Sequence, residues 1–213
     1  MKTWFFHPGS AISGWLLRIV GGGRVEGLEH VPRQGPFIMV VNHRSLADPP
    51  ILGWAVGHQV GRIVHFMAKE EMRRWPIVGW LADRSGVFFV RRGEGDRSAQ
   101  RAALRLLAEG RPIAIFPEGH RTRDGEIGPF HSAGVQLMLR ERPVPVYIVV
   151  SDGFWTCRRL VDFVFNIHKI DGRTEVLGPF PPPEPDRIPA FVDEMREKMV
   201  SHLHAMRGRD GRL

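Results

Sequence analysis

The stretch FIMVVNHRSLADPP, residues 37–50, decides the fold class. Five consecutive apolar residues, Phe37–Val41, have the length and composition of a strand that is buried on both faces of a parallel sheet. Asn42 and His43 follow at once, and we expect a helix over Pro49–Gly57. A buried strand that ends in polar side chains and is followed by a helix is typical of an α/β fold.

The same alternation of strand and helix patterns continues along the chain. Four more apolar runs are predicted as strands: Arg62–Met67, Val87–Arg91, Pro112–Phe116 and Val144–Val150. Two more segments are predicted as helices: Asp96–Ala108 and Ile188–Met206. We therefore predict a single α/β domain with a mostly parallel central sheet flanked by helices.

Length and composition agree with one globular domain. The chain has 213 residues, of which 43% are hydrophobic and 25% charged, and this excludes a disordered or low-complexity protein. Its single cysteine, Cys157, excludes an intramolecular disulfide framework and a zinc site built from cysteines. The composition fits a reducing compartment.

The charge balance indicates anionic partners. Lys and Arg number 30 against 23 Asp and Glu, for a formal net charge of +7. Nucleic acid, lipid headgroups and acidic proteins all satisfy this condition. Only four of the basic side chains are lysines, and the planar guanidinium of arginine matches phosphate and carboxylate groups.

The N-terminal segment has the pattern of a surface anchor. No apolar run approaches the roughly 20 residues of a spanning helix, so we do not expect an integral membrane protein. Trp4–Phe6 precede a short amphipathic helix predicted over Ser10–Val20, which the glycines Gly21–Gly23 end. We interpret residues 1–23 as a membrane-association segment and 24–213 as the globular domain. Packing of this helix on the protein's own core is the alternative.

The first candidate site is the pair His43 and Asp48. Their spacing of five residues would place them about 140° apart on a regular helix, so they can meet only across a non-helical turn. The following Pro49 makes such a turn plausible. It also makes Asp48 a good helix N-cap, and this structural role remains an alternative.

A second cluster follows the strand predicted over Pro112–Phe116. The segment AIFPEGHRTRDG brings Glu118, Gly119 and Arg121 into a loop that can present guanidinium and backbone N–H groups to a phosphate. A solvated polar turn is the alternative. Arg91 ends another predicted strand, and because the ends of parallel strands share one sheet edge, we expect the three clusters to converge.

Four blocks of sequence, in the same order, resemble the glycerophospholipid acyltransferase family, nearest to the 1-acylglycerol-3-phosphate acyltransferases. Asn42–Asp48 is similar to the family's Asn-His-x-x-x-x-Asp block. Gly86–Arg91 is similar to its Gly-x-x-Phe-x-x-Arg block, except that Arg91 comes one residue before the arginine position of that block, which falls on Arg92. Phe116–Arg121 is similar to its Phe-Pro-Glu-Gly-x-Arg block, and Pro143–Val146 to its short Pro-containing strand. The likeness extends over more than half of the chain, from Arg24 to Val150.

The resemblance implies acyl transfer in phospholipid biosynthesis. The acyl group would pass from a thioester, acyl-CoA or acyl-carrier protein, to the free hydroxyl of a lysophospholipid such as 1-acylglycerol-3-phosphate, with no further cofactor and no metal. By this resemblance His43 is the general base and Asp48 orients it. The remaining implied substrate-binding residues are Arg91, Glu118, Gly119, Arg121 and Lys69. A histidine of ordinary pKa near 6.5 suits proton removal from a hydroxyl at neutral pH.

The Trp/Phe-rich start and the excess of basic residues indicate where the protein acts. We expect a cytoplasmic protein that associates peripherally with the cytoplasmic face of the membrane, with an anionic lipid surface as partner and no nucleic acid.

Other function classes have less support. The sequence contains no His-Glu-x-x-His or Cys/His spacing of a metal hydrolase, no Gly-x-Ser-x-Gly of a serine hydrolase, and no Gly-Lys-Ser/Thr of a P-loop enzyme. The remaining alternative is a non-enzymatic binder of anionic lipid or nucleic acid that uses its arginine clusters. The stripe Arg97, Arg101 and Arg105 belongs to that hypothesis, although such stripes are usually solvated helix faces.

Overall fold

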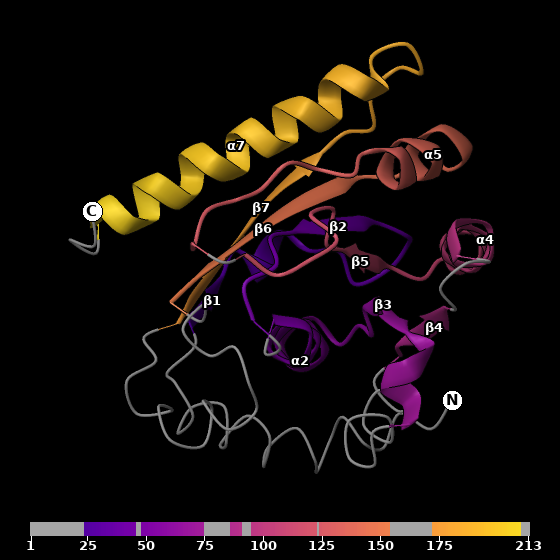
Figure 1. Cartoon of the computed structure of the whole chain (residues 1–213), viewed down its shortest axis with the longest axis horizontal. Coiled ribbons are helices and arrows are strands. Elements are labelled where there is room, and N and C mark those ends of the chain that lie inside the picture. Colours follow the sequence, from indigo (N-terminus) through magenta and orange to yellow (C-terminus); the bar gives the residue numbers. More distant parts are fainter. Residues whose placement is uncertain are drawn as a thin grey trace.

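The computed structural model describes residues 24–45, 48–74, 86–90, 95–122, 124–153 and 172–209. Within them the chain forms a seven-stranded sheet of order β1-β7-β6-β2-β5-β3-β4 (Figure 1). The strands are β1 (Arg24–Glu26), β2 (Ile38–Val41), β3 (His65–Lys69), β4 (Phe88–Val90), β5 (Ile113–Ile115), β6 (Val146–Asp152) and β7 (Arg173–Phe180). The α-helices are α2 (Asp48–Ala55), α4 (Gly95–Ala108), α5 (Ala133–Glu141) and α7 (Ile188–Arg209). Short helical turns are η2 (Leu28–His30), η3 (Val56–Val60) and η4 (Glu70–Arg74).

The sheet is mostly parallel, as the sequence predicts. β2 pairs in parallel with β5 and β6, and β3 pairs in parallel with β5 and β4. β7 runs antiparallel to β6, and β1 runs parallel to β7. The carboxyl ends of β2, β3, β4, β5 and β6 therefore lie at one edge of the sheet.

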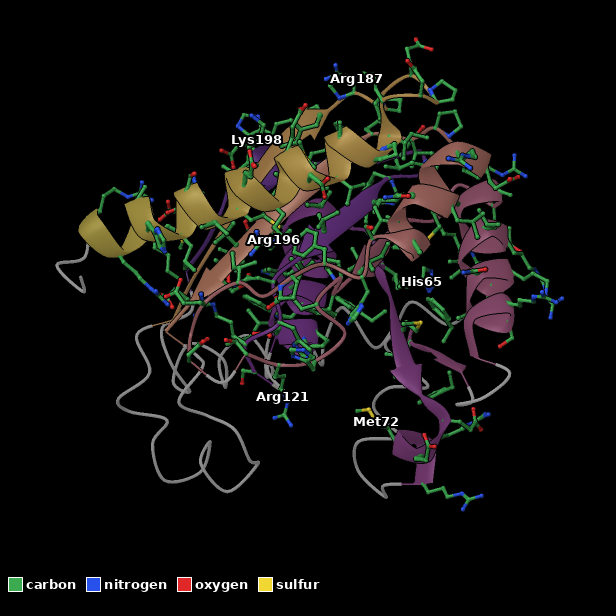
Figure 2. The ribbon with its side chains drawn as sticks, turned by 45° about the horizontal axis from the view of Figure 1, so that its top comes forward. His65, Met72, Arg121, Arg187, Arg196 and Lys198 are labelled. Atoms are coloured by element: carbon green, nitrogen blue, oxygen red, sulfur yellow. The ribbon has the colours of Figure 1, made fainter. Side chains whose placement is uncertain are left out.

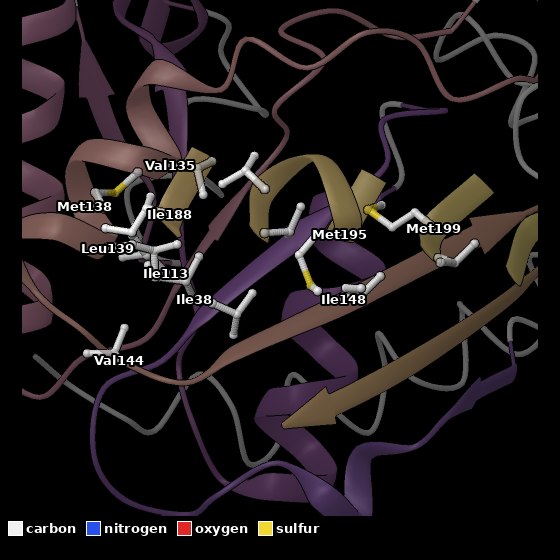
Figure 3. Close-up of a cluster of buried hydrophobic side chains, with 14 of the residues drawn as sticks. Ile38, Ile113, Val135, Met138, Leu139, Val144, Ile148, Ile188, Met195 and Met199 are labelled. Carbon is white, nitrogen blue, oxygen red and sulfur yellow. The ribbon is translucent and has the colours of Figure 1, made fainter. Parts of the chain in front are cut away.

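Helices cover both faces of the sheet. Alternate residues of β2 enter two separate cores: Ile38 and Val40 face α4, α5 and α7, whereas Met39 and Val41 face α2, η2 and η3. This is the two-residue period of a strand with two buried faces. Figure 3 shows the first core, where Met195 and Met199 of α7 pack near Ile148.

The predicted elements agree with the observed ones except at some boundaries. The third strand is predicted over Arg62–Met67 but begins at His65. Arg62 lies in the preceding loop, where its guanidinium donates hydrogen bonds to the carbonyl oxygens of Pro32, Gly35 and Gly110. The strands β1 and β7 and the helix α5 are not among the predicted elements.

Several expectations fall on residues that the structure does not describe. The helix over Ser10–Val20, the whole segment 1–23, Arg91 and Cys157 lie outside the described residues. Among the helices of the described ranges, none combines the length and apolar character needed to cross a membrane.

Candidate active site

The predicted site residues His43 and Glu118 follow two neighbouring strands, β2 and β5, after which the chain continues to opposite faces of the sheet. After β2 the chain enters α2 on one face, and after β5 it continues to α5 on the other (Figure 1). Open α/β sheets bind ligands at such a point, outside the carboxyl ends of the strands. His43 follows β2, and Glu118 follows β5.

His43 and Asp48 are in direct contact. Nδ1 of His43 lies 3.0 Å from Oδ2 of Asp48, and the two side chains are 20% and 1% exposed. The same Oδ2 accepts the backbone N–H groups of Arg44 at 2.6 Å and Ser45 at 2.7 Å. The carboxylate thus faces back toward the turn that carries His43, and its hydrogen bonds are not those of a helix N-cap.

The hydrogen bond to Asp48 assigns the roles of the two ring nitrogens of His43. A neutral imidazole that donates from Nδ1 carries its lone pair on Nε2, the atom that can accept a proton. The ring also packs against Phe116, with centroids 4.4 Å apart, and Phe116 in turn lies 6.3 Å from Phe66. The imidazole is therefore held by a carboxylate on one side and by an aromatic ring on the other.

Glu118 connects the loops that follow β2 and β5. Its side chain is buried, Oε1 accepts the backbone N–H of His43 at 2.7 Å, and Oε2 accepts that of Gly128 at 3.0 Å. The backbone N–H of Thr122 donates to the carbonyl oxygen of His43 at 2.9 Å. Both carboxylate oxygens of Glu118 thus bind protein backbone, and the side chain fixes the position of the His43 backbone.

The loop after Glu118 is a tight turn. Gly119 has φ +69°, and a Cβ atom there would lie 3.1 Å from Cδ2 of His131, so a glycine is favoured at this position. Arg121 lies on the same loop, half-buried, and its side chain projects away from the ribbon in Figure 2. Lys69 is the last residue of β3, at the same sheet edge.

The contacts of two side chains near the site were not predicted from the sequence. Asn42 bridges to β6 through its amide, which donates to the carbonyl oxygen of Ser151 at 3.0 Å and accepts its N–H at 2.8 Å. Arg44 is buried, and its Nη1 forms an ion pair with Oδ1 of Asp152 at 3.1 Å. Burial lowers the pKa of the Arg44 guanidinium, and the charge of Asp152 opposes this shift. Their partners lie more than 100 residues away, so a single sequence contains no signal for them.

The arginine stripe on α4 has the surroundings of a solvated face. Arg97 and Arg101 are exposed, and Arg105 pairs with Glu109 at 2.9 Å on the surface.

Among the described residues, no group of three or more His, Cys, Asp or Glu side chains is arranged to hold a metal ion.

A known protein family matches the part of the chain that carries this site. The family described as Acyltransferase matches residues 23–151, a range that includes His43, Asp48 and Glu118. The chain belongs to this acyltransferase family.

Two relatives have named acyltransferase activities. The acyltransferase chain is 38% identical over 122 residues to the lyso-ornithine lipid O-acyltransferase of Pseudomonas aeruginosa, covering 55% of this chain and 44% of the relative. It is 30% identical over 162 residues to the 1-acyl-sn-glycerol-3-phosphate acyltransferase of Borreliella burgdorferi, covering 73% and 60%. The chain spans about half the length of the curated relatives that match it first.

A solved structure shares the fold. The crystal structure of the 1-acyl-sn-glycerophosphate acyltransferase PlsC of Thermotoga maritima superposes with a TM-score of 0.72, at 24% sequence identity, over 94% of this chain and 80% of that chain. The match shows that the two chains have the same overall architecture.

Proposed function

We propose that the chain is an O-acyltransferase that moves a fatty acyl group from a thioester, acyl-CoA or acyl-carrier protein, to the free hydroxyl of a lysophospholipid such as 1-acylglycerol-3-phosphate. The contact between His43 and Asp48 carries this proposal, together with membership of the acyltransferase family. A hydroxyl is a weak nucleophile until a base removes its proton, and a histidine oriented by a buried carboxylate is suited to that task.

The reaction follows from the two ring nitrogens of His43. Nε2 takes the proton of the acceptor hydroxyl as its oxygen attacks the thioester carbonyl carbon, and Asp48 stabilises the imidazolium through Nδ1–H. The tetrahedral intermediate then collapses, the carbon–sulfur bond breaks, and the imidazolium returns its proton to the leaving thiolate. The products are an ester and a free thiol, and no acyl-enzyme is formed.

The acceptor headgroup is assigned to the loop after β5. Arg121 provides a guanidinium for the phosphate, and Gly119 allows the loop to turn close to it. Lys69, the last residue of β3, and Arg91, the residue after β4, are proposed as further contacts from the same sheet edge. Glu118 supports the site by fixing the backbone of His43.

A second candidate acceptor is a lyso-ornithine lipid. The 38% identity to the Pseudomonas aeruginosa protein of that name favours it. An ornithine headgroup offers a carboxylate where the phosphate would be, and a guanidinium fork also binds carboxylates. Arg121 would therefore bind the headgroup of either acceptor.

A panel of donors and acceptors tests the proposal. Acyl-CoA and acyl-carrier protein donors are combined with 1-acylglycerol-3-phosphate and lyso-ornithine lipid, and the products are identified by mass spectrometry. We expect an acylated 1-acylglycerol-3-phosphate. Absence of product from every pair would overturn the proposal, and salt-sensitive oligonucleotide binding in its place would favour the non-enzymatic alternative.

The same panel tests Arg121. Loss of one charge-assisted contact in Arg121→Ala should raise the acceptor KM about 10-fold to 100-fold, and Arg121→Lys should restore part of the affinity. Arg101→Ala, which removes an exposed arginine of α4, is the matched control and should leave the acceptor KM unchanged.

We also propose that the protein associates with anionic membrane surfaces through residues 1–23. The aromatic and amphipathic sequence of this segment and the net charge of +7 support the proposal. Deletion of Met1–Val20 should weaken sedimentation with anionic vesicles more than it weakens turnover of a soluble short-chain acceptor.

A further inference from the structure

Helix α7 lies outside residues 23–151, the part of the chain that matches the acyltransferase family, yet it contacts the loop that supports the site. In Figure 2, Arg196 points from α7 toward the interior, whereas Lys198 lies on the outer side of the helix. Two arginines of α7, Arg196 and Arg207, bind the segment 125–128 between β5 and α5.

Arg207 begins one line of contacts that ends at Asp48. Its Nε donates to Oδ2 of Asp152 at 3.1 Å, and its terminal nitrogens bind the carboxylate of Glu126 and the carbonyl oxygen of Gly125. Oδ1 of Asp152 forms the ion pair with Arg44. The backbone N–H of Arg44 then donates to Oδ2 of Asp48, the atom that also binds His43.

Arg196 begins a second line that ends at His43 itself. Its Nε donates to the carbonyl oxygen of Gly128 at 2.9 Å, and its Nη2 donates to that of Ile127 at 3.1 Å. The N–H of Gly128 binds one carboxylate oxygen of Glu118, and the other oxygen binds the N–H of His43. Both members of the pair are thus connected to α7 through buried side chains.

Before the first line reaches Asp48, its side chains carry equal numbers of positive and negative charges. Arg44 and Arg207 carry two positive charges, and Asp152 and Glu126 carry two negative charges. The Arg207 and Asp152 side chains are only 15% and 6% exposed, so solvent compensates little for a lost partner. Without Arg207, Asp152 would lose one of the two cationic partners that it has among the described residues and would shift toward the other, Arg44, whose backbone N–H holds Asp48.

We infer that Arg207 is a positioning residue of the active site, which acts on the His43–Asp48 pair through Asp152 and Arg44. The inference rests on the proposed function only for its effect on rate, because the geometric effect on His43 exists whether or not the chain is an enzyme. It gives α7 a role in catalysis in addition to its role in the core.

Arg207→Gln tests this role, with Arg209→Gln as matched control. Arg209 lies two residues along the same helix and also binds a mostly buried carboxylate, Glu175, at 2.6 Å. Glu175 is also bound by His202 of α7 and Arg173 of β7. The full-length variants are compared by Tm, by kcat and acceptor KM, and by the imidazole resonances of His43 in ¹⁵N spectra, assigned through their loss in His43→Gln.

Both variants should lower Tm, because each removes a cationic partner from a mostly buried carboxylate. Only Arg207→Gln should shift the His43 resonances and lower kcat, by about 10-fold to 100-fold with little change in acceptor KM, since a small displacement of a reacting group has such effects. Arg207→Lys should recover part of both. Were Arg207→Gln not to fold, the milder Arg207→Lys would still have to shift the His43 resonances.

Unshifted His43 resonances in the Arg207 variants would overturn the inference, as would identical kcat values in Arg207→Gln and Arg209→Gln. If the unaltered protein transfers no acyl group, the proposed function fails. The comparison of His43 resonances would still decide the inference.

Discussion

Asp48 concentrates three hydrogen bonds on one oxygen. His43 Nδ1 and the backbone N–H groups of Arg44 and Ser45 all lie within 3.0 Å of Oδ2. Two of these bonds shape the turn, and the third orients the imidazole. A single carboxylate therefore both builds the local backbone and sets the tautomer of His43.

Asp48→Asn separates these two roles. The amide oxygen can still accept the backbone N–H groups, so we expect the free energy of unfolding to change by no more than about 1 kcal/mol. The negative charge that stabilises the imidazolium is lost, and kcat should fall about 10²-fold to 10⁴-fold. Parallel denaturant unfolding and steady-state kinetics measure both quantities. A variant of full activity would reduce Asp48 to a structural residue.

That His43, Asp48 and Glu118 lie together was predictable, because chemistry-bearing side chains follow apolar runs whose ends share one sheet edge. His43, Asp48 and Glu118 are found in this way from the sequence. The direction of the Asp48 carboxylate was not predictable, because it depends on the turn at Arg44 and Ser45. Nor were the partners of Glu118, since the N–H of His43 lies 75 residues away in the chain.

At the scale of elements, Gly86 allows the segment that leads into β4 to lie close to the start of β3. It has φ +78°, and a Cβ atom there would lie 2.7 Å from Cγ2 of Ile63 and 3.1 Å from Nδ1 of His65. Its carbonyl oxygen is also the partner of His65 Nδ1, at 2.7 Å. The glycine that opens the Gly-x-x-Phe-x-x-Arg block thus allows close contact between two strands.

Gly86→Ala should destabilise the protein by about 2–4 kcal/mol, the sum of the left-handed backbone cost and the steric overlap. Gly35→Ala is the control, because Gly35 has φ +81° but no atom within 4 Å of a Cβ position. It should cost only about 1–2 kcal/mol. Chemical denaturation of both variants gives the difference, and equal losses would show that steric overlap at Gly86 contributes nothing.

The predicted elements were those with an uninterrupted apolar run or a helical period. β7 lacks both, because it buries Thr174 and Glu175 beside Val176. Glu175 is tolerated there because His202 and Arg209 of α7, together with Arg173 of the same strand, bind its carboxylate. Burial alone would raise the pKa of Glu175, but these hydrogen bonds lower it. Such distant compensation cannot be inferred from the strand's own sequence.

At the scale of the whole molecule, the titration of His65 makes the free energy of unfolding depend on pH. His65 is buried, and desolvation lowers the pKa of its imidazole, although the hydrogen bond to Gly86 opposes the shift. The unfolded chain binds this proton near the ordinary pKa of about 6.5. Below that pH the unfolded state holds more protons than the folded state, so stability falls as the pH falls.

His65→Asn removes this proton and keeps a donor for the carbonyl oxygen of Gly86. The free energy of unfolding of the unaltered protein should decrease between pH 7 and 5.5, with a slope of at most about 1.4 kcal/mol per pH unit from this group. The variant should show a shallower slope over the same interval. Urea titrations at a series of pH values measure it, and parallel slopes would mean that His65 titrates alike in both states.

The central claim is that His43 acts as the general base of an acyl transfer. The most direct measurement is kcat for transfer from acyl-CoA or acyl-carrier protein to 1-acylglycerol-3-phosphate by the unaltered protein and by His43→Ala. The account predicts a decrease in kcat of about 10²-fold to 10⁴-fold, with the acceptor KM and Tm nearly unchanged. A His43→Ala variant that is folded and transfers acyl groups at the full rate would contradict it.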